Sequence, residues 1–124
     1  MKKLALILTL AVGLAGCSTL QTLQQVAGTP VSPTQAIVAA NAFDAAESAA
    51  TAYLVYCKTN LSTAACSADN RRSVIKYTRA GRAARNQIET AISTNTSVPA
   101  ALYNSLVAAV TNLKASPAAN YGAQ

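Results

Sequence analysis

The sequence predicts an all-α fold, a small antiparallel three-helix bundle that follows a signal peptide and a flexible tether. Apolar residues recur at intervals of three and four in three long segments, and turn-forming residues separate these segments. Alanine dominates throughout, and the 124 residues suffice for one small domain. The domain is expected over 32–116, with helices at about 33–57, 70–93 and 98–115.

The first predicted helix has a well-marked start. Ser32, Pro33, Thr34 and Gln35 form an S-x-x-Q capping box with proline at the first helical position, where its missing N–H costs nothing. Polar residues occupy the side opposite the apolar seam, so the helix is amphipathic. The seam comprises Ala36, Ala39, Phe43, Ala46, Ala50, Tyr53 and Cys57.

The second predicted helix follows a polar loop, and either Ser67 or Asp69 can cap it. Gly81 lies on its seam, although glycine costs about 1 kcal/mol relative to alanine inside a helix. We therefore expect a facing helix to approach closely there, at Phe43 or a tyrosine. The seam comprises Val74, Tyr77, Gly81, Ala84, Ile88 and Ala91.

The third predicted helix is apolar over a wide arc. Ser97 can cap it, and Pro99 falls in its first turn. Pro117 ends the helix, and residues 117–124 are expected to form a disordered tail. Its apolar residues are Leu102, Tyr103, Leu106, Val107, Ala109, Val110 and Leu113.

The N-terminus has the layout of a secretory signal peptide. Met1-Lys2-Lys3 is a short positive start, and the apolar run LALILTLAV behind it is too brief to cross a bilayer as a stable helix. Residues 1–16 are therefore expected to be removed, and residues 17–31 to form a flexible tether ahead of the domain.

The signal ends in Leu14-Ala15-Gly16-Cys17, which resembles the lipobox of bacterial lipoproteins. The resemblance implies that the Cys17 thiol receives a diacylglycerol, that cleavage precedes it, and that the new amino end is acylated. Several acyl chains on one residue give stable membrane attachment. Ser18, in place of an aspartate, implies an exported protein on the periplasmic face of the outer membrane, in a Gram-negative host. Apart from this covalent lipid, no cofactor is expected.

Cys57 and Cys66 are predicted to form a disulfide. An exported chain folds in an oxidising compartment, where such pairs close. Closing a loop of this size stabilises a fold by about 2 to 3 kcal/mol on the chain-entropy model. No metal site is expected, because the sequence contains no histidine and no third cysteine lies nearby.

A basic face is predicted on the second helix, opposite its seam, with Glu89 as the one acid at its far end. It is either a solvated face or a binding surface for anionic lipid, cell-wall carboxylates or an acidic envelope protein. Nucleic acid is not an expected partner of an exported protein. The face comprises Arg71, Arg72, Lys76, Arg79, Arg82 and Arg85.

The sequence indicates a binding or structural role rather than an enzyme. Without histidine, the candidate bases are the four acids and Lys58. Asp44 and Glu47 lie three apart on one helical face, but they are more simply solvated polar residues. The expected function is that of a lipid-anchored envelope protein, with the basic face as its possible contact surface.

Three stretches together resemble small helical proteins encoded by bacteriophages and prophages: TPVSPTQAIVAANAFDAAESAATAYLVYC, RAGRAARNQIE and PAALYNSLVAAV. This resemblance implies an alternative function. The protein would be a phage-encoded envelope effector that docks on a specific outer-membrane protein, in superinfection exclusion or as an accessory to lysis.

Overall fold

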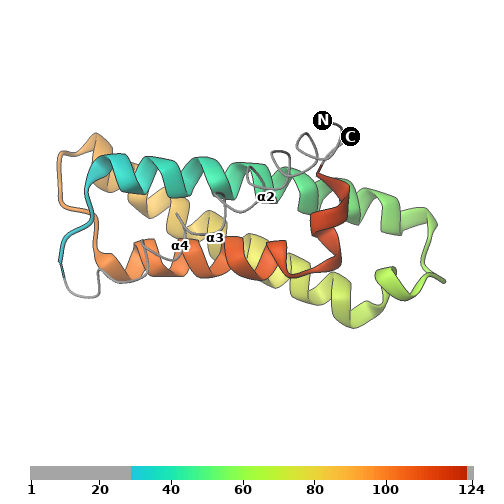
Figure 1. Cartoon of the computed structure of the whole chain (residues 1–124). Coiled ribbons are helices and arrows are strands. Elements are labelled where there is room, and N and C mark those ends of the chain that lie inside the picture. The colour runs from blue at the N-terminus through green and yellow to red at the C-terminus, as the bar shows by residue number, and fades with distance from the viewer. Residues whose placement is uncertain (1–28, 123–124) are drawn as a thin grey trace, which may run out of the picture.

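The structure, a computed structural model, describes residues 29–122, which form three long helices and two short 3-10 turns. Figure 1 shows the three helices lying side by side along the length of the molecule. The predicted all-α, three-helix character is therefore confirmed. No helix within 29–122 is both long and apolar enough to span a bilayer. In order, the elements are α2 (Pro33–Thr59), η1 (Ala64–Cys66), α3 (Ala68–Ser93), α4 (Ala100–Lys114) and η2 (Pro117–Tyr121). The predicted signal peptide, Cys17 and most of the tether lie outside the described residues.

The predicted capping box starts α2. The Ser32 hydroxyl accepts a hydrogen bond from the Gln35 backbone N–H, and the Gln35 side chain accepts one from the Ser32 N–H. The seven predicted seam residues are all buried, together with Ala49. The helix runs to Thr59, two residues beyond the predicted end, and Asn60 caps it by donating to the Tyr56 carbonyl at 2.9 Å.

Helix α3 begins at Ala68, two residues earlier than predicted, because the Ser67 hydroxyl accepts from the Asn70 N–H at 3.3 Å. Thr78 is buried, whereas the predicted seam residue Tyr77 is only partly so. The helix ends in a Schellman motif around Asn95, whose φ is 53°. The Thr96 N–H donates to the Ala91 carbonyl, and the Asn95 N–H to the Ile92 carbonyl.

Small residues let the three helices pack closely, and a few large side chains fill the space between them. Phe43 and Tyr53 of α2 are completely buried, as predicted. Ile88 of α3 and the apolar arc of α4, including Leu106 and Leu113, complete the core. The α4 arc is buried as predicted, except that Leu102 is only partly covered.

The start of the domain differs from the prediction. Val31 is not tether: it is buried and forms an isolated antiparallel bridge with Val98, through a hydrogen bond from the Val31 N–H to the Val98 carbonyl at 3.2 Å. Because Val98 is held in this extended pairing, α4 starts at Ala100, two residues later than predicted. Pro99 occupies the N-cap position, and Ser97 does not cap the helix.

The prediction of a disordered tail over 117–124 is wrong for the part that the structure describes. Pro117–Tyr121 form η2, which Ser116 caps by accepting from the Ala118 N–H. Ala118 is completely buried. The Tyr121 ring packs edge-on against Tyr53, with ring centroids 5.5 Å apart. Burial of aromatic surface against the C-terminal part of α2 stabilises this packed position of the segment.

Candidate binding surface on α3

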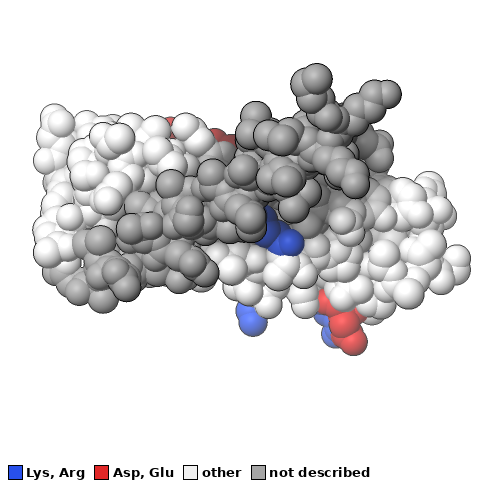
Figure 2. Space-filling model, viewed as in Figure 1, with Lys and Arg blue, Asp and Glu red and all other residues white. Residues whose placement is uncertain are grey.

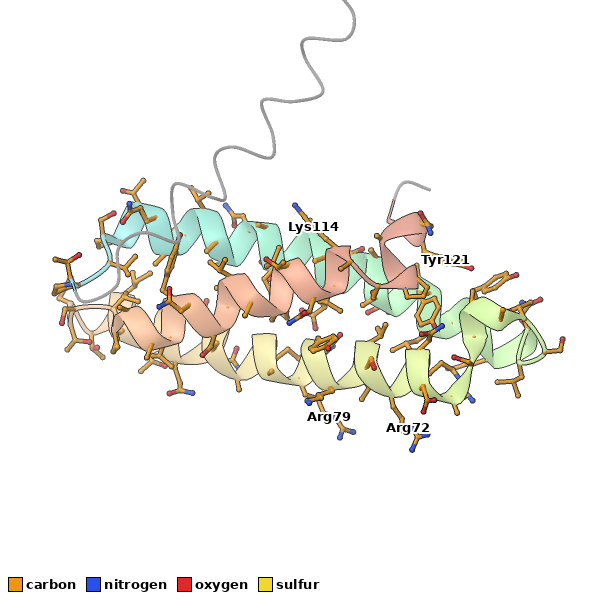
Figure 3. All side chains as sticks on the ribbon, turned by 60° about the horizontal axis from the view of Figure 1, so that its bottom comes forward. Arg72, Arg79, Lys114 and Tyr121 are labelled. Carbon is orange, nitrogen blue, oxygen red and sulfur yellow. A yellow bond between two sulfur atoms is a disulfide. The ribbon has the colours of Figure 1, made fainter. Side chains whose placement is uncertain are left out.

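The six predicted cations of the basic face all lie on α3, and their side chains have three different environments. In Figure 3, Arg72 and Arg79 project from α3 away from the other two helices, while Lys114 lies on the opposite side of the molecule. On the face shown in Figure 2, charged atoms of the described residues are few and scattered.

Arg82 and Arg85 bind carboxylates of α2. The Arg85 guanidinium contacts both oxygens of Asp44, with Nε 2.7 Å from Oδ1, and its Nη1 lies 2.9 Å from Glu89 Oε2. Arg82 pairs with Glu47 across the two helices through a single contact, from its Nε to Oε1. The hydrogen bond and charge of Asp44 raise the pKa of Arg85. These two arginines therefore join α3 to α2.

Asp44 and Glu47 have environments that differ from the sequence-based expectation. They were expected to be solvated residues on the polar side of the first helix, but each has an arginine partner on α3. The sequence showed a basic face with a single acid at its end, and α2 supplies two more. This part of the surface therefore carries charges of both signs, as ordinary solvent-exposed surfaces do.

Arg71 and Arg72 lie in the first turn and a half of α3. Arg71 is half-buried, and its Nε donates to the Cys66 carbonyl at 3.1 Å. Arg72 pairs with Asp69 at 2.7 Å, but both side chains are largely exposed. An exposed pair of this kind contributes little to stability, so Arg72 remains available for other anions.

Lys76 and Arg79 have no ion-pair partner within residues 29–122. Both are exposed, and with Arg72 they follow the spacing i, i+4, i+7, which places them along one side of the helix. We call Arg72, Lys76 and Arg79 the basic row. At about 1.5 Å of rise per residue, it extends roughly 10 Å along α3.

The predicted disulfide joins the end of α2 to η1. Cys57 and Cys66 are both completely buried, with their Cα atoms 5.3 Å apart. Backbone carbonyls of the loop are bonded from both neighbouring helices. Tyr53 Oη donates to the Ala65 carbonyl at 2.6 Å, and the Asn70 side-chain amide donates to the same carbonyl at 3.2 Å. The covalent bond and these hydrogen bonds hold the loop in one conformation.

Two of the grooves that border α2 lie next to residues described above. One, of about 250 Å³, lies between α2 and α3 and is bordered by the Arg85–Glu89 pair. The other, of about 390 Å³, lies beside η2 and is mostly apolar. Within 29–122, no three His, Cys, Asp or Glu side chains come together in a group that could hold a metal ion. The first is lined by Ile37, Ala40, Asn41, Arg85, Ile88, Glu89 and Ile92, and the second by Ser48, Ala52, Val55, Tyr56, Tyr121 and Gly122.

Comparison of the chain with protein-family models, with curated proteins and with solved structures found no match. The described surface offers two kinds of contact: ion pairing along α3 and apolar contact beside η2.

Proposed function

We propose that this protein is a lipid-anchored envelope protein without enzymatic activity, whose antiparallel three-helix domain contacts an anionic membrane surface through the basic row. The anchor is the lipid on Cys17. The observation that carries the proposal is the position of Lys76 and Arg79, which are exposed, aligned with Arg72, and without an ion-pair partner among residues 29–122.

The row orients the domain rather than recruiting it to the membrane. Each cation near an anionic surface contributes about 1 kcal/mol, so three cations give only about 3 kcal/mol. That amount is weak for a free protein. For a domain already attached through Cys17, the same contacts are intramolecular and act at a high effective concentration. The row would then hold α3 along the headgroups.

The experiment uses the mature chain from residue 17 with Cys17→Ser, so that binding depends on the domain and not on the lipid. Because about 3 kcal/mol corresponds to half-maximal binding at about 6 mM lipid, the titration is run at low salt up to about 20 mM lipid, where binding this weak is measurable. Co-sedimentation is measured with vesicles of phosphatidylethanolamine and phosphatidylglycerol, and with neutral phosphatidylcholine vesicles. We expect Lys76→Glu, Arg79→Glu to weaken binding to the anionic vesicles by at least about 30-fold, the equivalent of two lost contacts. Binding should also fall steeply with salt.

The matched control is Lys58→Glu, Lys114→Glu, which changes the net charge by the same amount but lies off the basic row. We expect it to weaken binding by less than about threefold, through the general field of the protein. Equal losses in the two double variants, or no preference for anionic vesicles, would reject the basic row as the contact surface.

A second candidate function is that of a phage-encoded envelope effector, in superinfection exclusion or as a lysis accessory, that docks on a specific outer-membrane protein. The observation that favours it is the exposure of Val55, Tyr56 and Leu61 near the disulfide, since exposed apolar groups mark protein contacts. Affinity capture of the acylated protein from its native envelope distinguishes the two. Saturable capture of a single membrane protein would favour the effector, and capture of lipid alone would favour the first function.

A further inference from the structure

The disulfide end of the molecule carries three of the large apolar side chains that the described surface exposes. Val55 is 56% exposed, Tyr56 38% and Leu61 57%, whereas Ile37 and Val38 lie near the opposite end of α2. Val55 and Tyr56 line the 390 Å³ groove together with Tyr121. The Tyr56 and Tyr121 rings are tilted against each other with centroids 5.1 Å apart. This end, where α2 gives way to α3, is green to yellow-green in Figure 1.

The loop that exposes Leu61 is held rigidly. The Thr63 backbone N–H and hydroxyl both donate to the Asn60 carbonyl, at 3.2 and 2.9 Å. The Cys57–Cys66 disulfide and the bond from Tyr53 to the Ala65 carbonyl fix the far side of the loop. A preorganised loop loses little conformational freedom when it binds, which favours affinity. An exposed leucine on such a loop is suited to contact a partner.

The charges at this end select the kind of partner. Lys58 is the only charged residue between Glu47 and Asp69 in the sequence, and it is exposed. Asp69 already pairs with Arg72. Pairing of two such tips around a two-fold axis would bring two Lys58 side chains into one interface with no carboxylate of the tip to pair with them, which is unfavourable. Charge complementarity therefore favours a different protein that supplies carboxylates.

We propose that the disulfide tip, formed by Val55, Tyr56, Lys58, Leu61 and Tyr121, docks an acidic, apolar segment of a partner protein. An apolar side chain of that segment occupies the groove lined by Val55, Tyr56 and Tyr121, and a second apolar side chain packs on Leu61. A neighbouring carboxylate pairs with Lys58. The proposal rests on the same exposed residues as the second candidate function. It is separate from the basic row, so it and the membrane-contact proposal can each fail without the other.

The test is selection of a random 12-residue peptide library against the mature chain carrying Cys17→Ser. The selected peptides are synthesised, and their affinities are measured by fluorescence anisotropy. We expect enriched peptides to combine an aliphatic or aromatic residue with Asp or Glu. Val55→Asp and Leu61→Asp should each weaken binding at least about tenfold, as for central contacts of an interface.

Val38→Asp is the matched control, because Val38 lies on the same helix and is 54% exposed, almost as much as Val55. We expect it to change affinity by less than about twofold, since distant sites act independently. Circular dichroism shows whether each variant keeps its helices. Lys58→Ala should weaken binding and reduce its salt dependence, which a purely apolar contact would not predict.

Several results would overturn the proposal. One is the absence of enrichment over the Leu61→Asp protein, and another is the enrichment of basic peptides. Sedimentation that shows a dimer in wild type and a monomer in Leu61→Asp would assign the tip to a second copy of the chain. Binding to phosphatidylglycerol vesicles that is lost in Leu61→Asp but kept in Lys76→Glu, Arg79→Glu would assign it to a membrane instead.

Discussion

Gly81 of α3 lies directly against the ring of Phe43 of α2. A Cβ placed on Gly81 would lie 2.6 Å from both Cδ2 and Cζ of that ring, closer than real side chains approach one another. Phe43 is completely buried, so its ring cannot swing into solvent. The absence of a side chain at Gly81 therefore sets how closely α2 and α3 approach.

Gly81→Ala is expected to destabilise the protein. Overpacking a core of this kind costs about 1 to 3 kcal/mol. This cost equals or exceeds the roughly 1 kcal/mol that alanine gains over glycine in helix propensity. Urea denaturation measures the change in the free energy of unfolding. In a Phe43→Leu background, the cost of Gly81→Ala should shrink because the clashing ring is gone. A stabilised Gly81→Ala protein would show that propensity alone decides this position.

Removal of the Tyr53 hydroxyl and removal of the Tyr103 hydroxyl are expected to change the stability of the protein in opposite directions. Tyr53 Oη donates to the Ala65 carbonyl at 2.6 Å, whereas buried Tyr103 Oη has no hydrogen-bond partner among residues 29–122. Tyr53→Phe should cost about 1 kcal/mol, and Tyr103→Phe should stabilise by about 1 kcal/mol, because an unpaired buried hydroxyl is unfavourable. Thermal and chemical denaturation of the two variants measure both signs, and a destabilised Tyr103→Phe would contradict the burial argument.

The stability of the protein should fall at alkaline pH. Burial raises the pKa of both Tyr53 and Tyr103 above the ordinary value of 10.0, although the charge of Arg71 opposes this for Tyr53. As pH rises past about 10, the unfolded chain loses these protons before the folded chain does, so unfolding becomes easier. The contribution is complete below pH 10 and is lost as pH passes through the raised pKa. Denaturation midpoints between pH 8 and 11 should show the fall, and Tyr53→Phe, Tyr103→Phe should flatten it.

Removal of the disulfide should cost about 2 to 3 kcal/mol, since Cys57 and Cys66 close a loop of only about ten residues. The comparison is between oxidised and reduced protein in urea, and both cysteines are buried, so reduction should require partial unfolding. The effect should be largest on the loop that carries Leu61. Equal midpoints for the oxidised and reduced protein would mean that the hydrogen bonds alone hold the loop.

The helical part of the fold was largely predictable because its signals are local. The capping box at Ser32 and Gln35 and the seams of α2 and α4 follow from residues close in sequence. All appear in the structure except that Leu102 of α4 is only partly covered. Gly81 also predicted a contact between two helices, because a glycine on an apolar seam indicates that a neighbouring helix approaches closely there. Phe43 was one of the expected neighbours, and it is the residue in contact.

The ion pairs between helices could not be predicted in the same way. Which turn of α2 faces which turn of α3 depends on packing over the whole length of both helices. The pairs Arg85–Asp44 and Arg82–Glu47 therefore had no local signal, and they leave fewer of the six cations of the predicted basic face available for other partners. The 3-10 turn after α4 did have a signal. Ser116-Pro117 repeats the Ser32-Pro33 start of α2, with serine as the cap in both.

The bridge between Val31 and Val98 gives the domain a mechanical property. Any pull on the chain ahead of Thr29 enters the folded domain at Val31, and the hydrogen bond to the Val98 carbonyl passes part of that load to the start of α4. Both valines are buried, so tension must first break an apolar contact before it can unwind the opening turn of α2. If the chain is attached through Cys17 as proposed, the bridge lies between that attachment point and the three helices, and it is the first contact that tension on the chain would have to break.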